Sequence, residues 1–236
     1  MTDIKDMTAG QVAGQPSVLT AELTAREAQY GDAINRFWAS QNDGLTDGAH
    51  DPGHLRRVWA NARAIGLDLG ADMEILLAAA WFHDAVNLPK NHPDRARASQ
   101  LSADWAATYL SDTDFPRAKI PATCHAIAAH SFSAGIEPET CEAEVLQDAD
   151  RLEALGAIGI ARMFHVGGAM GGALFDAADP LALHRPLDDR AFSLDHLEVK
   201  LFPVAQSMRT ATGRAMAEAR VEWMRSFRTR LLTEIT

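Results

Sequence analysis

Four residues of types that bind divalent metals stand where they can act together. His83 and Asp84 are adjacent at the end of a strongly apolar segment, His54 lies in the preceding segment, and the run Asp-Ala-Asp-Arg-Leu at 148–152 lies far downstream. A buried ionisable pair needs partners, because burying a lone charge is strongly unfavourable. A divalent ion is one such partner, since it binds neutral imidazole and carboxylate together. We therefore interpret His83 and Asp84 as half of a metal site that His54 and a distant carboxylate can complete.

Helices are expected to position these residues, because apolar residues recur at steps of three and four through most of the chain. In the first half we expect a helix over Ala21 to Ala39, a loop over Gln41 to Pro52 that is rich in Asp, Gly and Asn, and an amphipathic helix with Pro52 in its first turn. The next helix begins near Ala71 and is apolar on two neighbouring faces, which predicts the centre of the core.

The second half continues the helical pattern. We expect helices over Asp94 to Leu110, Ala122 to His130, Cys141 to Phe164, Leu194 to Met208 and Thr212 to Leu232. The segment from Gly167 to Pro186 holds four glycines and two prolines and predicts a long loop, a kind of segment that often carries function. With no internal repeat and no linker, the sequence predicts a flexible tail over residues 1–20 and a single all-α domain over residues 21–236.

Composition excludes some classes of function. The net charge of −10 argues against a surface built to bind a nucleic-acid polymer. It leaves small phosphorylated substrates open, because a metal ion supplies local positive charge. The chain has no apolar run long enough to cross a bilayer and no secretory signal at its start, so we expect a cytoplasmic protein with free thiols at Cys124 and Cys141.

Four segments resemble the motifs of a known family, the HD-domain superfamily of metal-dependent phosphohydrolases. Residues 50–54 read His-Asp-Pro-Gly-His, and residues 81–90 read Trp-Phe-His-Asp-Ala-Val-Asn-Leu-Pro-Lys. Residues 125–132 supply a middle histidine segment, and residues 147–156 read Gln-Asp-Ala-Asp-Arg-Leu-Glu-Ala-Leu-Gly. The resemblance covers residues 45–230 and is closest to a bacterial subfamily with nucleoside-triphosphate pyrophosphohydrolase members.

The resemblance implies an HD-type helical bundle with a divalent metal, Mn²⁺ first, with Mg²⁺, Fe²⁺, Co²⁺ and Ni²⁺ as alternatives. Its implied ligands are His54, His83, Asp84 and Asp150. Asp150 is favoured over Asp148 because the family places this ligand just before the basic residue and the leucine. The two carboxylates are about 200° apart around a helix, so both are not expected to reach one ion.

The resemblance also implies a small phosphorylated substrate, foremost a (deoxy)nucleoside triphosphate cleaved to monophosphate and pyrophosphate. The candidates to hold phosphate oxygens are cations: Lys90, Arg151, His196 and Lys200, with Arg57 as a further option. The candidate catalytic residues are Asp84, His50, Asp51, Asn87 and His130. Several relatives carry an acidic residue where this chain has Asn87, and an amide takes up no proton at neutral pH. Either attack proceeds without that base, or Asp51 or a histidine replaces it.

Two alternative functions stay open at this point. The same core serves phosphomonoesterases and phosphodiesterases acting on nucleotides. Asn87 also motivates a catalytically weak, metal-dependent nucleotide-binding protein. The sequence leaves the oligomeric state open.

Overall fold

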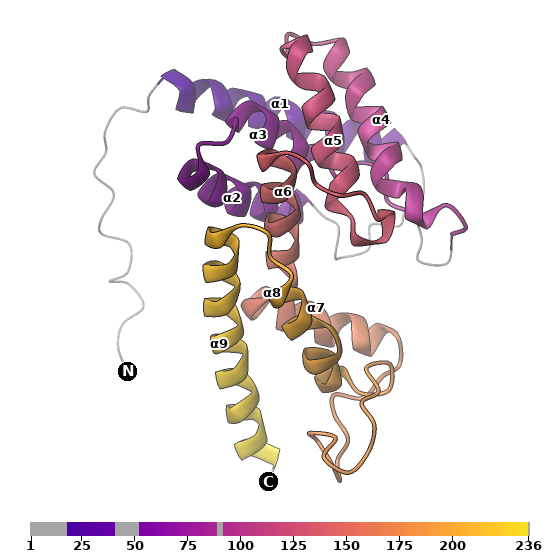
Figure 1. Ribbon diagram of the computed structural model, residues 1–236. Coiled ribbons are helices and arrows are strands. Elements are labelled where there is room, and N and C mark those ends of the chain that lie inside the picture. The colour runs from indigo at the N-terminus through magenta and orange to yellow at the C-terminus, as the bar shows by residue number, and fades with distance from the viewer. Residues whose placement is uncertain (1–17, 41–51, 89–91, 236) are drawn as a thin grey trace.

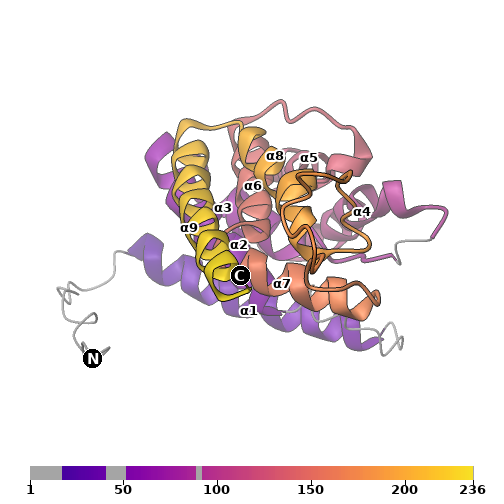
Figure 2. The same cartoon turned by 90° about the horizontal axis from the view of Figure 1, so that it is seen from below.

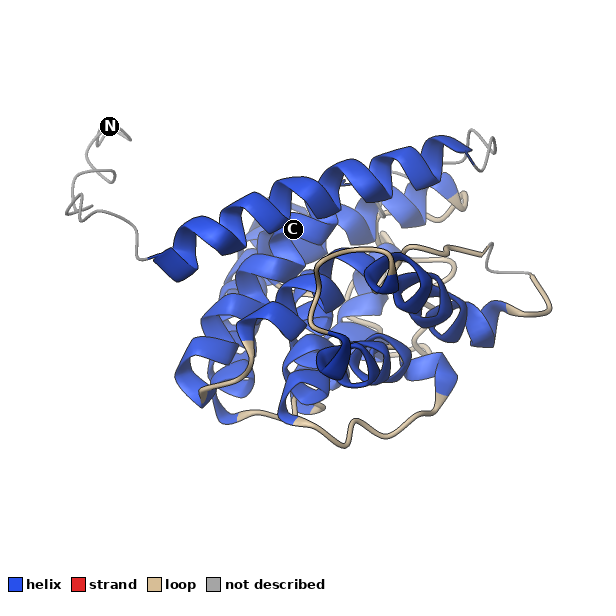
Figure 3. Ribbon diagram, turned by 90° about the horizontal axis from the view of Figure 1, so that it is seen from above, coloured by secondary structure: helices blue, strands red, loops and turns tan. Residues whose placement is uncertain are grey.

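The structure is a computed structural model that describes residues 18–40, 52–88 and 92–235, and these residues fold as packed helices (Figures 1 and 3). The α-helices are α1 (Val18–Ser40), α2 (Pro52–Leu69), α3 (Met73–Phe82), α4 (Ala98–Ser111), α5 (Ile120–His130), α6 (Cys141–Arg151), α7 (Gly156–Ala169), α8 (Phe202–Gln206) and α9 (Ala211–Ile235). No strand forms in the described part of the chain, where one isolated bridge joins Ala173 to Phe192. The expected all-α fold is confirmed.

Helix α3 is the centre of the core, as its two apolar faces predicted. Every residue from Ile75 to Phe82 is buried. The helix starts at Asp72, whose carboxylate accepts hydrogen bonds from the backbone N–H groups of Glu74 and Ile75. Helices α1, α2, α5 and α6 pack around it, and α4 covers the outer side of α5. Figure 2 shows α1 lying along one side of the bundle.

Helix α2 shows how the apolar pattern sets the packing. It begins at Pro52, as expected, and buries Leu55, Val58, Ala62 and Ile65 against α3 and α6. This stripe at steps of three and four faces the core, while the opposite face stays in solvent. His54 lies in the first turn, beside the buried stripe, and so points inward at the end of the helix.

The single helix expected over Cys141 to Phe164 is wrong. Helix α6 ends at Arg151, a 3₁₀ turn η5 (Leu152–Ala154) follows, and α7 begins afresh at Gly156. Gly156 has φ of 72°, a left-handed conformation that favours glycine, and Leu155 before it is extended. The N–H of Gly156 donates to the sulfur of Met224 on α9, which helps to hold the break in place.

The C-terminal third packs beside α6 (Figure 1). Helix α7 extends to Ala169, so Gly167 and Gly168 are helical, and the expected long loop starts after them. The next structured turns are η6 (Ser193–Asp195) and the π-helical η7 (Leu197–Leu201), which leads into α8. The loop is tied down where Arg185 pairs with the buried carboxylate of Asp195 at 2.6 Å. No helix in the described ranges combines the length and apolar character needed to cross a bilayer.

Candidate metal centre

Three helix ends bring the four predicted ligands to one point. His54 lies in the first turn of α2, His83 and Asp84 directly follow α3, and Asp150 is in the last turn of α6. The Nε2 atoms of His54 and His83 are 3.2 Å apart. His54 Nε2 lies 3.5 Å from Asp150 Oδ1 and 3.7 Å from Asp84 Oδ2. His83 Nε2 lies 3.5 Å from Asp84 Oδ2 and 3.8 Å from Asp150 Oδ1.

His83 is held as a neutral imidazole whose lone pair faces this cluster. Its ring is fully buried, and Nδ1 lies 2.9 Å from the carbonyl oxygen of Ala80. A carbonyl only accepts, so Nδ1 carries the proton and Nε2 is the acceptor. Burial is the main cause that lowers the pKa of His83 to about 4, so the ring is uncharged at neutral pH.

The carboxylate of Asp84 is surrounded by imidazoles. His130, at the end of α5, brings its Nε2 to 3.7 Å from Asp84 Oδ1 on the side away from His54. Burial would raise the pKa of Asp84, but the neighbouring His83, His130 and His54 outweigh it and hold this pKa well below the usual range. Asp84 is therefore a carboxylate at every pH at which the protein is expected to work.

His54 differs from His83 in its protonation. Burial acts to lower its pKa, yet the carboxylates of Asp84 and Glu153 beside its two ring nitrogens and the charge of Asp150 raise the pKa to about 9. In the metal-free protein a proton therefore sits among these acceptors. A divalent cation at the same point would replace that proton and satisfy the same carboxylates.

The donor set fits a divalent ion. Ligand atoms of His54, His83 and Asp150 lie within 4.8 Å of one another, and so do those of His83, Asp84 and His130. Mixed imidazole nitrogen and carboxylate oxygen suits ions such as Mn²⁺, Fe²⁺, Co²⁺, Ni²⁺ and Zn²⁺. His83 supplies a direct sign of fit, because its Nδ1 proton is committed to the carbonyl oxygen of Ala80 and the Nε2 lone pair is therefore directed at the cluster.

Asp148 faces away from this point, as the helical geometry predicted. It is fully buried, and Oδ1 accepts from the backbone N–H of Arg209 at 2.8 Å. Its Oδ2 accepts from both the backbone N–H and the hydroxyl of Thr210, each at 2.8 Å. Asp148 thus fixes the start of α9 against α6, whereas Asp150, two residues on, joins the cluster.

Several predicted substrate and catalytic residues have other partners. Arg151 donates to the carbonyl oxygen of Ser207 at 2.7 Å, and Asn87 accepts from Arg95 at 2.7 Å. His196, which lies between η6 and η7, pairs with Asp189 of the preceding loop at 2.8 Å, and Lys200 is exposed on η7. The positions of His50, Asp51 and Lys90 lie outside the described residues.

The two histidines of α5 separate, as their spacing of five residues suggests. His130 is buried at the cluster, and its Nδ1 donates to the carbonyl oxygen of Ile127 at 2.7 Å. His125 points away from the cluster: its Nε2 accepts from the backbone N–H of Glu139, in the turn before α6, at 2.9 Å. Burial lowers the pKa of His130, but hydrogen bonding and charge from Asp84 raise it overall.

Sequence reasoning assigned no role to three residues that contact the predicted site residues or lie close to them in the chain. Glu153 is buried, and its Oε2 lies 3.6 Å from His54 Nδ1. Arg95 donates to Asn87 and also to the carbonyl oxygen of Leu88. Phe132, two residues after His130, is 88% exposed. The helix break that brings Glu153 inward was not anticipated, and an exposed aromatic residue has no signature in periodicity.

Comparisons with known proteins agree with this geometry. The family model "HD domain" matches residues 53–155, a stretch that contains the whole cluster. The chain is 33% identical over 189 residues to the uncharacterized protein YpgQ of Bacillus subtilis (strain 168), covering 78% of this chain and 84% of YpgQ.

Solved structures have the same fold. The crystal structure of Bacillus subtilis YpgQ in complex with ADP is similar with a TM-score of 0.65 at 26% identity, covering 90% of this chain and 96% of YpgQ. A crystal structure of an HD-superfamily hydrolase from Bacillus thuringiensis is similar with a TM-score of 0.68 at 27% identity, covering 90% of this chain and 97% of the hydrolase.

Proposed function

This chain belongs to the HD domain family and is a metal-dependent phosphohydrolase, and from that premise we propose that it hydrolyses nucleoside triphosphates to monophosphate and pyrophosphate. The observation that carries the proposal is the cluster in which the Nε2 atoms of His54 and His83 lie 3.2 Å apart and each lies within 3.8 Å of a carboxylate oxygen of both Asp84 and Asp150. The ADP complex of YpgQ supports a nucleotide as the substrate class.

The four clustered residues would hold the ion, with manganese as our first candidate because mixed imidazole and carboxylate ligands suit it. When bound, the ion supplies the positive charge that polarises a phosphoryl group and lowers the pKa of water. The work of the chain is to position the substrate and to neutralise its charge, which is most of what phosphoryl transfer requires.

His130 is our candidate proton donor to the leaving group. Its Nδ1 is committed to a backbone carbonyl, its Nε2 faces Asp84, and its pKa is raised, so the ring can carry a second proton near neutral pH. Asn87 takes up no proton and instead holds Arg95. His50 and Asp51 stay candidates for the base that Asn87 does not provide.

Cations on the chain would bind the phosphates. Arg151 directly follows the ligand Asp150, and only its Nη1 is used by Ser207, so further N–H groups can face a phosphate. Lys90, His196 and Lys200 stay candidates for the same task. Phe132 offers an exposed ring two residues from His130, and a nucleobase can stack on such a ring.

The proposal is tested with manganese-loaded wild type and Asp84→Ala on a panel of nucleoside triphosphates, with products separated by chromatography. We expect pyrophosphate and monophosphate from wild type and turnover reduced at least a hundredfold in the variant, in line with the loss of a metal ligand. Intact nucleotides in both samples, with metal bound in the wild type, would contradict the proposal.

Two alternatives are separated by the same panel. The ADP complex of YpgQ is also consistent with the first, a phosphomonoesterase or phosphodiesterase acting on nucleotides, which would show as orthophosphate or ester cleavage without pyrophosphate. Asn87 favours the second, a catalytically weak nucleotide-binding protein, which would show as nucleotide binding without products.

A further inference from the structure

The three histidines of the cluster share one arrangement. Each turns Nε2 toward the carboxylates and Nδ1 toward an acceptor outside the cluster. For His83 that acceptor is the carbonyl oxygen of Ala80, and for His130 it is the carbonyl oxygen of Ile127, in both cases three residues earlier in the chain. These carbonyls fix the tautomer and the orientation of the two rings.

His54 cannot use the same device, because it lies in the first turn of α2 and has no earlier turn of its own helix behind it. Its Nδ1 faces Glu153 instead, with Oε2 at 3.6 Å. Glu153 is 3% exposed and lies on η5, the turn created where α6 and α7 separate. The acceptor behind His54 is therefore a buried carboxylate from a distant segment of the chain.

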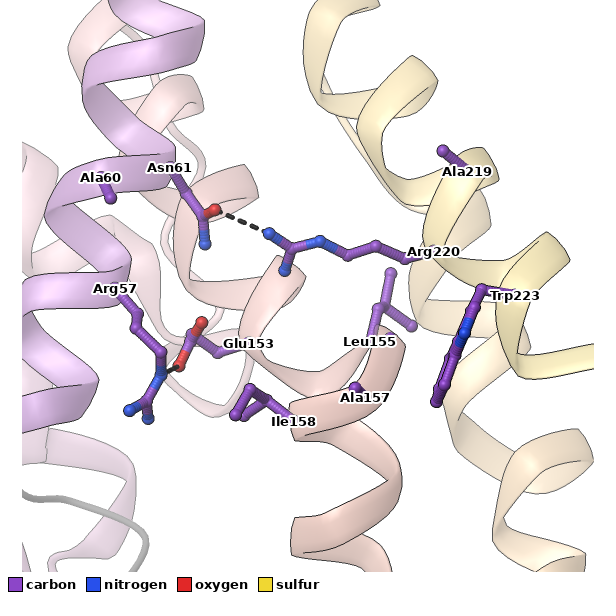
Figure 4. A pocket seen from close by; sticks show the side chains of 11 residues that line it. Arg57, Ala60, Asn61, Glu153, Leu155, Ala157, Ile158, Ala219, Arg220 and Trp223 are labelled. Carbon is purple, nitrogen blue, oxygen red and sulfur yellow. Dashed lines mark hydrogen bonds and ion pairs between the residues drawn. The ribbon is translucent and has the colours of Figure 1, made fainter. Parts of the chain in front are cut away.

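A buried carboxylate needs a partner of opposite charge, and Arg57 provides it. Its Nε donates to Glu153 Oε2 at 2.6 Å. Arg57 lies one turn after His54 on α2. The same helix therefore carries His54 and the arginine that pairs with Glu153, the carboxylate facing His54. Figure 4 shows Arg57 and Glu153 meeting between α2 and η5.

The pair forms part of the wall of a cavity of about 480 Å³ between α2, the start of α7 and α9 (Figure 4). The opposite wall carries Arg220, which donates to Asn61 at 2.8 Å, and Trp223. Arg57 is 38% exposed, whereas Glu153 is buried. Small solutes can therefore reach the Arg57 side of the pair without entering the metal centre.

We propose that Glu153, held by Arg57, is the positioning residue for His54 and strengthens metal binding through it. The carboxylate selects the tautomer with the proton on Nδ1, which leaves the Nε2 lone pair directed at the cluster. Its negative charge also makes the imidazole a better donor to a cation. This inference rests on the metal centre of the proposed function and is independent of the substrate.

The test measures Mn²⁺ affinity directly, from the electron paramagnetic resonance signal of free Mn²⁺, with no substrate present. Loss of such an outer partner typically weakens metal binding by about tenfold to a hundredfold. We expect Glu153→Ala to show that loss and Glu153→Gln a smaller one, because the amide oxygen still faces Nδ1 but carries no charge.

Glu74→Gln is the matched control. Glu74 also pairs with a cation, Lys119 at 2.7 Å. It lies in the first turn of α3, at the opposite end of this helix from His83 and Asp84. Its replacement removes a comparable ion pair and is expected to leave the Mn²⁺ affinity at the wild-type value. Circular dichroism on every variant shows which are folded before their affinities are compared.

A second variant keeps the proposal falsifiable if Glu153→Ala does not fold. Arg57→Ala leaves Glu153 in place and opens its cation site to the cavity. We expect weakened Mn²⁺ binding that low-millimolar guanidinium chloride restores and the same concentration of sodium chloride does not. Wild-type Mn²⁺ affinity in folded Glu153→Gln and Arg57→Ala would overturn the proposal, whatever the enzyme does with nucleotides.

Discussion

Asp148 and Asp150 stand two residues apart on α6 and serve different purposes. Asp150 points to the histidines, and Asp148 accepts three hydrogen bonds at the start of α9. A helix turns about 200° over two residues, so one helix end can contribute both a ligand and a structural carboxylate. The same pair of residues therefore allows metal binding and stability to be separated by mutation.

We expect Asp150→Ala to lose the metal with little loss of stability in the metal-free state, because this side chain is about a third exposed. Asp148→Ala should keep the metal but lower the free energy of unfolding by about 3 kcal/mol, since it leaves two buried donors of Thr210 and the partly buried backbone N–H of Arg209 without their acceptor. Elemental analysis and urea unfolding of both variants check this. Equal metal content in wild type and Asp150→Ala would contradict the assignment.

The exposed ring of Phe132 gives a second residue-level prediction. Base stacking on an aromatic side chain contributes about 1–3 kcal/mol. We expect Phe132→Ala to raise KM for a nucleoside triphosphate by roughly fivefold or more, with kcat near the wild-type value. Tripolyphosphate has no base, so its KM should not change. The control is Leu67→Ala. It also removes an exposed apolar side chain, but one that lies on α2.

At the scale of elements, the break between α6 and α7 shapes the site. A continuous helix would carry residues 152–154 along its axis, whereas η5 turns Glu153 against α2. The break depends on Gly156, whose φ of 72° places its α-carbon close to Arg220, so that a Cβ there would meet the Arg220 side chain at 3.3 Å.

Gly156→Ala is therefore expected to lower the free energy of unfolding by about 1–2 kcal/mol, the cost of a left-handed conformation for a residue with a Cβ. Gly168→Ala is the matched control, because Gly168 is helical and a Cβ there meets nothing within 4 Å. That variant should be neutral or more stable by up to about 1 kcal/mol. Chemical denaturation of both proteins measures the difference. A destabilised Gly168→Ala with an unaffected Gly156→Ala would contradict this account.

The start of α3 gives a prediction with a pH dependence. The Asp72 carboxylate is partly desolvated, which alone would raise its pKa, but Lys119 at 2.6 Å and the first N–H groups of α3 lower the pKa below 3.8. A lowered pKa means that the stabilisation is complete above the unfolded-state value and is lost as the pH falls through the folded-state value.

We expect Asp72→Asn to cost about 1 kcal/mol at pH 7 and at pH 5, because the amide can still cap the helix but cannot pair with Lys119. The gap between wild type and variant should shrink below pH 3.8, where the wild-type carboxylate also becomes protonated. Urea unfolding across this range tests the sign. A gap that widens toward acid would contradict it.

At the scale of the whole molecule, the metal centre joins elements that are far apart in the sequence. Its candidate ligands come from the start of α2, the end of α3 and the end of α6, with His130 from the end of α5. The unfolded chain holds no such site, so an ion that binds the folded protein must stabilise it.

Mn²⁺ at a hundred times its Kd is expected to stabilise the wild type by about 2.7 kcal/mol, a rise in Tm of roughly 5–10 °C for a domain of this size. A chelator should reverse the rise. Asp150→Ala should show no rise at the same concentration, and thermal unfolding followed by circular dichroism measures all three samples. The same increase in Asp150→Ala would place the ion elsewhere.

The sequence by itself determined the helical class, the central position of α3 and that Asp148 and Asp150 point in different directions. These follow from local rules: apolar residues at steps of three and four, and the rotation per residue of a helix. The run from Ile75 to Phe82 is apolar on every face, so a helix formed by it has to be surrounded by other helices. His83 and Asp84 directly follow this run in the sequence and therefore lie at the end of the buried helix.

Only the tertiary structure decided which acceptors stand behind the histidines, that α6 and α7 are separate helices, and that Arg151 and Asn87 have other partners. These outcomes depend on contacts between residues far apart in the chain, such as Gly156 with Met224 and Glu153 with His54 and Arg57. Periodicity shows which face of a helix is buried, but it does not show which distant side chain contacts that face. The candidate metal centre consists of such contacts between distant side chains.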